Sequence, residues 1–147
     1  MAVPTGNGTE NITSSKLEDV ADSTQSLIVG VQHHVYTVLS IIVHGIAVAS
    51  GTGDRTLQVF LSGYDNHETP ASNQPFFLFK WEVGVAETFV FNDKFTFMGY
   101  EPSSNTQAAV LAQAGSVAQT VKAYTDSADT KVDIITTFID QDWSGSN

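Results

Sequence analysis

Histidine is the residue type in this chain best suited to binding a metal ion or transferring a proton. His33 and His34 are adjacent, and adjacent side chains of a strand point to opposite faces, so they cannot bind one ion without a bulge. His34 and His44 share a face of a straight strand, but they lie about 33 Å apart along it. We therefore expect no histidine metal site, and we interpret His44 as a hydrogen-bonded polar residue in a mostly apolar strand.

Carboxylates are the second group able to do chemistry, because clusters of them bind Ca²⁺ and pairs of them catalyse glycoside hydrolysis. Asp126 and Asp129 lie in a turn that could supply oxygen ligands, but no EF-hand or nonapeptide pattern surrounds them. Asp140 and Asp142 are also close in the sequence, yet a glycosidase is defined by two carboxylates about 5 to 10 Å apart across a cleft. Solvated turns explain these acids more simply, and we expect neither a metal ion nor another cofactor.

The usual local signatures of nucleophilic catalysis are missing from the sequence. The chain has no cysteine, which excludes a thiolate nucleophile, a thiolate metal site and a disulfide framework. It also has no G-x-S-x-G elbow and no S-x-x-K motif in a serine-hydrolase setting. We therefore expect a protein without catalytic residues, which is not an enzyme.

Composition and charge narrow the class of partner. The 147 residues include 16 acidic and 6 basic side chains, a formal net charge of -10. Phosphate backbones are bound by clustered Lys and Arg, so nucleic acid is not an expected direct partner. The N-terminal stretch lacks the basic and apolar segments of a signal peptide, and no apolar run is long enough to span a bilayer. We therefore expect no membrane contact.

The stretch 76–98 is the most strongly patterned part of the chain, and it contains seven of the nine phenylalanines. Apolar side chains recur there every second residue, which is the period of a strand with one buried face. Gly84 interrupts the pattern, and Asn92-Asp93 either closes a two-residue hairpin or marks a bulge in one long bent strand. The residues expected on the buried face are Phe77, Phe79, Trp81, Val83, Phe89, Phe91, Phe95 and Phe97.

The apolar pattern of five further stretches is typical of strands, namely 27–29, 35–48, 56–61, 116–124 and 131–139. We expect the third to pair with the second as a hairpin, and the last two to form a closing hairpin. Short strands joined by turn residues predict an all-β fold, an antiparallel β-sandwich or jelly-roll-like structure. We expect a single body at residues 26–143, followed by a polar C-terminal tail at 144–147.

Two segments between the strands have alternative interpretations. The segment Tyr64–Pro75, rich in Pro and Asn, is either a binding loop or a solvated connection. The segment Gln107–Ala114 is either a short helix or a strand. Aromatic and polar side chains at exposed positions can fill a partner's pocket, so we take Tyr64, His67 and Trp143 as candidate partner-binding residues.

Residues 1–25 are polar and lack any period, which predicts an extended N-terminal arm. The apolar residues of this stretch, which include Val20, are too sparse for a core strand. The stretch is either a disordered tail or an arm that orders on a partner. We favour the second and take Val3, Ile12 and Leu17 as docking residues. Deleting residues 1–20 is then expected to leave the melting temperature of the body nearly unchanged.

Four segments suggest a family when taken in order. They are the strand VYTVLSIIVHGIAV, the GTGD turn into RTLQVFL, the segment AETFVFNDKFTF, and the closing SVAQTVKAYTDSADTKVDIITTFI. This order resembles the small β-sandwich virion proteins of tailed bacteriophages, which are head decoration or cement proteins and related neck and fibre components. The resemblance implies a non-enzymatic structural protein, synthesised in the host cytoplasm and located at the capsid surface. It also implies binding to the major capsid protein or other virion proteins, as a homotrimer with a terminal arm.

Apolar residues on both faces of one segment predict subunit contacts. Phe76 and Leu78 alternate with Phe77 and Phe79, which makes more apolar surface than one small sandwich buries. We therefore expect a homo-oligomer. The competing hypothesis is a carbohydrate- or receptor-binding module of a phage tail or fibre, which would act through the 64–75 loop and an exposed aromatic side chain.

Overall fold

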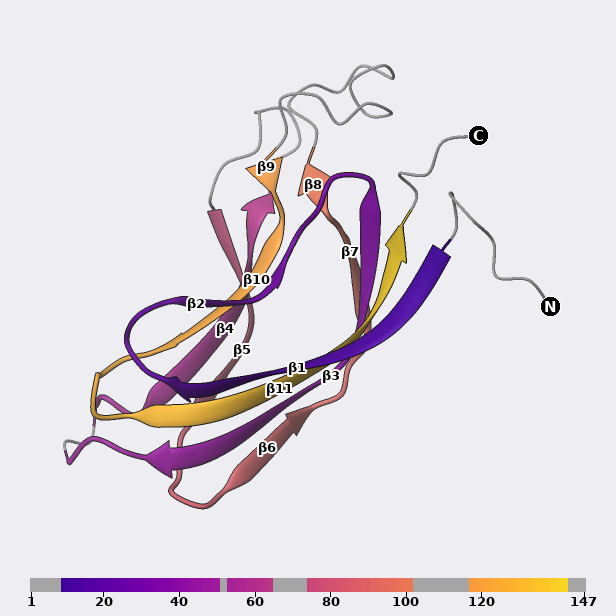
Figure 1. Ribbon diagram of the computed structural model, residues 1–147. Coiled ribbons are helices and arrows are strands. Elements are labelled where there is room, and N and C mark those ends of the chain that lie inside the picture. The colour runs from indigo at the N-terminus through magenta and orange to yellow at the C-terminus, as the bar shows by residue number, and fades with distance from the viewer. Residues whose placement is uncertain (1–8, 51–52, 65–73, 102–116, 143–147) are drawn as a thin grey trace.

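The computed structural model describes residues 9–50, 53–64, 74–101 and 117–142. Two antiparallel sheets face each other, with a two-stranded ribbon at one end (Figure 1). The predicted all-β antiparallel sandwich is therefore confirmed. Within the described ranges, no helix could cross a membrane. The strands are β1 (Thr9–Val20), β2 (Gln25–Val29), β3 (His34–Ala47), β4 (Thr56–Tyr64), β5 (Gln74–Glu82), β6 (Thr88–Phe91), β7 (Phe95–Met98), β8 (Tyr100–Glu101), β9 (Val117–Ala118), β10 (Thr120–Thr125) and β11 (Lys131–Asp142).

One long hairpin, rolled up on itself, accounts for the strand order of both sheets. Strands β4 and β5 pair at the tip of this hairpin. From the tip toward the two ends of the chain, β3 pairs with β6 and β7, then β2 pairs with β10, and finally β1 pairs with β11. All these pairings are antiparallel. Rolling places alternate pairs in opposite sheets, with the orders β1-β11-β3-β6 and β2-β10-β4-β5. Pairing of β11 with β3 and of β10 with β4 completes each sheet. This winding of two sheets is a jelly roll.

The core lies between the two sheets and is built mainly of aliphatic side chains. Ile41 of β3 and Ile134 of β11 are fully buried from one sheet, and Leu57 of β4 and Val121 of β10 are fully buried from the other. Burying one such side chain contributes about 1.5 to 3 kcal/mol. The alternation of buried and outward residues along these strands is the pattern that located them in the sequence.

An aromatic layer closes the side of the sandwich between β5 and β6. The ring centroid of Phe89 on β6 lies 5.2 Å from that of Phe79 and 5.7 Å from that of Trp81, both on β5. Phe91 stacks on Phe79 at 4.8 Å. Because β5 and β6 belong to different sheets, these contacts join the two sheet edges. The aromatic residues of the 76–98 stretch are half-buried at these positions, where they face one another across the sheet edges.

A bulge decides between the two interpretations of the segment that joins β6 and β7. Both strands run antiparallel to β3, with Phe91 opposite Ile41 and Phe95 opposite Val38. Three residues between the phenylalanines therefore oppose two residues of β3. The segment is a bulge in one bent strand, and the two-residue hairpin is excluded.

A second bulge, in β5, overturns part of the predicted buried face. Val59 pairs with Phe79, but the next residue of β4, Phe60, pairs with Phe77, so Leu78 is the extra residue. Leu78 packs against the core, whereas Phe77 is 40% exposed. The prediction that Phe77 lies on the buried face is therefore wrong, because the bulge turns it outward.

Neither of the two predicted hairpins is present. Strand β4 pairs with β5 and β10, and not with its predecessor β3. Strand β10 belongs to the sheet opposite β11, so these two do not pair either. In both cases the connection carries the chain from one sheet to the other, which is what a rolled hairpin requires.

The N-terminal stretch contains a strand of the body. From Thr9 onward it forms β1, which runs beside β11 along most of its length (Figure 1). Val20 is 1% exposed and belongs to the core, and Leu17 packs against the core. The expectation that these residues are too sparse to build a core strand is therefore wrong. The register shifts between them, with Asp19 at a φ of 55°, so that both side chains turn inward.

Candidate functional surfaces

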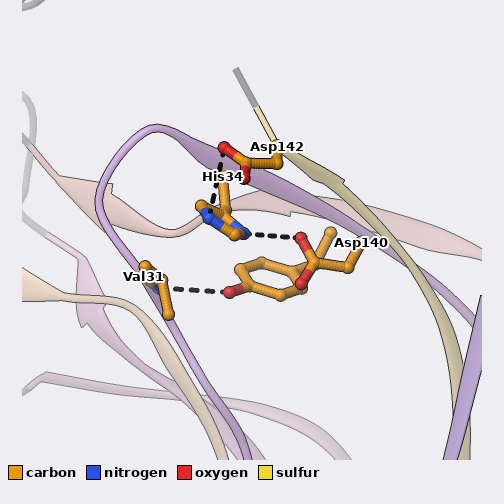
Figure 2. Close-up of polar contacts among 5 residues, drawn as sticks. Val31, His34, Asp140 and Asp142 are labelled. Atoms are coloured by element: carbon orange, nitrogen blue, oxygen red, sulfur yellow. Dashed lines mark hydrogen bonds and ion pairs between the residues drawn. The ribbon is translucent and has the colours of Figure 1, made fainter. Parts of the chain in front are cut away.

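A histidine and two aspartates meet where β3 begins and β11 ends (Figure 2). His34 Nδ1 donates to Asp140 Oδ1 at 2.7 Å, and His34 Nε2 lies 3.4 Å from Asp142 Oδ1. Antiparallel pairing sets Asp142 directly opposite His34. Both ring nitrogens therefore face carboxylates, and the cluster ties the end of β11 to the start of β3. Near the other end of β3, His44 Nδ1 lies 2.9 Å from Thr88 Oγ1, which confirms its interpretation as a hydrogen-bonded residue.

Tyr36 lies beside this cluster, two residues further along β3. Its side chain is buried, with its ring centroid 6.0 Å from that of His34 and 5.1 Å from that of Phe97. The hydroxyl oxygen accepts a hydrogen bond from the Val31 backbone N–H at 3.2 Å. Burial, reinforced by the negative charge of Asp140, raises the pKa of Tyr36 to about 12.

The raised pKa predicts that Tyr36 makes folding stability fall as the pH rises from about 10 to about 12. An unfolded tyrosine loses its proton near pH 10, so in this window the unfolded chain binds fewer protons than the folded chain and is favoured. Below about pH 10 Tyr36 is protonated in both the folded and the unfolded state, and its contribution to the free energy of unfolding is fully present. The measurement is thermal unfolding of the wild type and Tyr36→Phe across this range, and the melting-temperature advantage of the wild type should shrink with pH. A constant difference would contradict the prediction.

A group of aromatic rings lies on the outer face of the four-stranded sheet, with one ring exposed and two half-buried. It consists of Phe60 of β4, Phe77 of β5 and Tyr124 of β10, which we call the outer aromatic cluster. Ring centroids are 5.6 Å apart for Phe60 and Phe77 and 5.9 Å apart for Phe60 and Tyr124. Lys80 Nζ lies 4.6 Å from the centroid of Phe77. Because aromatic side chains are enriched at protein interfaces, the exposed ring of Phe77 makes this face a candidate contact site.

A chain of hydrogen bonds runs from this cluster to the turn that precedes β11. The Tyr124 hydroxyl donates to Gln58 Oε1 at 3.1 Å, and Gln58 Nε2 donates to Asp126 Oδ1 at 2.6 Å. An Asp126 carboxylate oxygen therefore accepts a side-chain hydrogen bond in the turn considered above for Ca²⁺. Across the described ranges, no group of three or more His, Asp or Glu side chains is placed to hold a metal ion.

The residues predicted to bind a partner are spread over different parts of the fold. Ile12 and Leu17 both lie on β1, but on opposite faces: Ile12 is 73% exposed, and Leu17 packs against the core. Tyr64 is the last residue of β4, paired with Gln74. The segment considered as a short helix, the C-terminal tail and most of the 64–75 loop lie outside the described residues. Three of the predicted residues also lie outside them, namely Val3, His67 and Trp143.

Sequence reasoning missed the outer aromatic cluster and the His34 cluster for different reasons. A signal for the first was present, because Phe60 and Tyr124 occupy the outward positions of strands whose alternate residues are buried. No local signal was present for the second, because His34 meets Asp140 and Asp142 only through the register of β3 with β11.

Comparison with known proteins gives no family for the chain. No protein-family model matches it, and no curated protein sequence does. A solved structure described as "Bacillus endospore appendages form a novel family of disulfide-linked pili" is 14% identical, with 98% of this chain and 96% of that chain covered. Its TM-score is 0.39, and a likeness of this size carries no argument about function.

Proposed function

We propose that this chain is a non-enzymatic virion structural protein that binds and stabilises the surface of a phage capsid, as a decoration or cement protein. In this proposal the sandwich and its N-terminal segment contact the major capsid protein or other virion proteins, and the chain acts as a homo-oligomer. The observation that carries an assembly role is the outer aromatic cluster, because Phe77 leaves 40% of its surface exposed beside two further rings.

Two further points support the proposal. The order of strands and turns in the sequence resembles that of small virion proteins of tailed phages, as described above. The jelly roll is also a fold of viral capsid and lectin domains, although one fold hosts many functions and this support is by analogy.

The direct test is the number of copies of this chain in purified virions, measured by quantitative mass spectrometry against the major capsid protein. A copy number comparable with that of the capsid protein is expected for a decoration protein. A copy number far below it would place the chain in the neck, tail or fibres, and complete absence from virions would contradict the proposal.

Substitution of Phe77 tests whether the outer aromatic cluster is the contact. Phe77→Ser is expected to abolish co-sedimentation with capsids while leaving the melting temperature nearly unchanged, because the ring lies on the outer face of the sheet. Val85→Ser is the matched control, since Val85 is 57% exposed at a turn away from the cluster, and it should leave binding intact. Glycan binding that depends on Phe77, with no binding to capsids, would support the carbohydrate-binding hypothesis instead.

A further inference from the structure

We infer that β1 is a self-pairing edge strand, which joins two copies of this chain in a continuous antiparallel sheet. Strand β1 is at the end of the order β1-β11-β3-β6, with β11 on one side and no described strand on the other (Figure 1). In an antiparallel ladder, alternate N–H and C=O groups of an edge strand point away from its partner. A row of such groups is a template for a further strand.

The regular part of β1 defines where two copies would pair. Its register with β11 is unbroken from Thr9 to Leu17, and the shift near Asp19 ends it. Thr13 is the midpoint of this nine-residue segment, so a two-fold axis through Thr13 pairs the full segment with itself. The contact is isologous, because each copy uses the same residues.

The charges of β1 match in this register. With Thr13 opposite Thr13 of the second copy, Glu10 lies opposite Lys16 and Lys16 opposite Glu10, on the same face of the sheet. Moving the register by two residues either removes both pairs or sets Glu10 opposite Glu18, a like-charge contact. Full overlap and charge complementarity therefore select the same register.

The contacts within one copy are compatible with this pairing. Lys16 Nζ lies 2.9 Å from Glu18 Oε1, an exposed ion pair of a kind that contributes little to stability. Glu10 Oε1 accepts a hydrogen bond from Gln141 Nε2 of β11 at 2.6 Å, which is also a contact between exposed side chains. Because both contacts are exposed and contribute little to stability, each can give way to an ion pair with a second copy.

Pairing also covers the most exposed of the large apolar side chains that the structure describes. Ile12 is 73% exposed and lies opposite Ser14 of the second copy in this register. The two Ile12 side chains then become diagonal neighbours across the axis, within reach of each other. The exposure of Ile12 in a single copy is explained if this strand is covered in the dimer.

This inference goes beyond the proposed function, since it concerns isolated protein and holds whether or not the chain binds a capsid. A two-fold contact makes a dimer, which differs from the trimer implied by the resemblance to phage virion proteins. Failure of the tests below would leave the virion proposal standing, and absence from virions would leave this inference standing.

Cysteine crosslinking tests the register between the two β1 strands. The natural chain has no cysteine, so each introduced cysteine is the only one in its chain. Thr13→Cys is expected to give a disulfide-linked dimer on mild oxidation, since opposite residues of antiparallel strands lie within disulfide reach. Asn11→Cys and Ser15→Cys should each crosslink poorly alone but form a heterodimer when mixed, because residues 11 and 15 are opposite. Val90→Cys, which is exposed on the distant strand β6, is the control. Failure of Thr13→Cys to crosslink above this control would overturn the inference.

Charge reversal gives an independent test by analytical ultracentrifugation. Glu10→Lys and Lys16→Glu should each weaken self-association about tenfold or more, because each places two like-charged pairs in the dimer. A mixture of the two variants should form a heterodimer, and the double variant should regain the wild-type dimer. A wild-type chain that stays monomeric at micromolar concentration, or variants that associate as the wild type does, would count against the inference.

Discussion

Deletion of residues 1–20 is expected to destabilise the body strongly, which is the opposite of the outcome that the sequence alone predicts. The deletion removes β1 and with it the side chains of Val20, fully buried, and Leu17, packed against the core. Burial of two such aliphatic side chains contributes roughly 3 to 5 kcal/mol, a large part of the 5 to 15 kcal/mol that typically separates folded from unfolded states. Loss of β1 also leaves β11 as an unprotected edge.

The measurement is chemical denaturation of the full chain and of two truncations, one lacking residues 1–8 and one lacking residues 1–20. The difference between the truncations isolates the contribution of β1. Equal stabilities would show that β1 contributes nothing to the body and would restore the interpretation of the stretch as an independent arm.

Two point substitutions in β1 separate its buried contacts from its exposed ones. Val20→Ala should lower the free energy of unfolding by about 2 kcal/mol, because it removes buried methyl groups and leaves a cavity. Ile12→Ala, on the same strand, should change it by less than about 0.5 kcal/mol in the monomer, because its side chain is exposed. Similar effects from both would contradict the assignment of Val20 to the core.

The strands of this fold were largely predictable from the sequence, because burial on one face imposes a period of two. Ile134 and Thr136 of β11, and Leu57 and Val59 of β4, are buried at alternate positions as expected. The two-residue period failed to predict the buried face at the β-bulges. Leu17 and Val20 are three residues apart, so the alternation predicts opposite faces, yet a register shift turns both inward.

The pairing of the strands was not predictable from local turns. The connections after β3 and after β10 have ordinary turn residues, which suit a hairpin and a crossing between sheets equally well. Only the pairing of distant segments, such as β1 with β11, selects the rolled hairpin. For the same reason the His34 cluster could not be anticipated, since His34 and Asp140 are 106 residues apart in the chain.

One substitution at two buried threonines should have opposite effects on stability. Thr130 and Thr136 are both nearly inaccessible, with 0% and 1% of their surface exposed, and valine has almost the same shape as threonine. The Thr130 hydroxyl donates to the Asp54 carbonyl at 2.6 Å and accepts from the Ala49 N–H at 3.0 Å. The Thr136 hydroxyl is buried and makes no hydrogen bond within the described structure.

Thr130→Val is therefore expected to cost about 2 kcal/mol or more, because it leaves a buried N–H without its acceptor. Thr136→Val should instead stabilise the protein by about 1 kcal/mol, because it replaces a desolvated, unbonded hydroxyl by a methyl group. Chemical denaturation of the two variants, with the wild type alongside, measures both effects, and hydrogen exchange at the Ala49 amide should rise only in Thr130→Val. Because the shape change is the same at both sites, opposite signs can arise only from the hydrogen bonds, and a loss of stability at both sites would show that packing dominates instead.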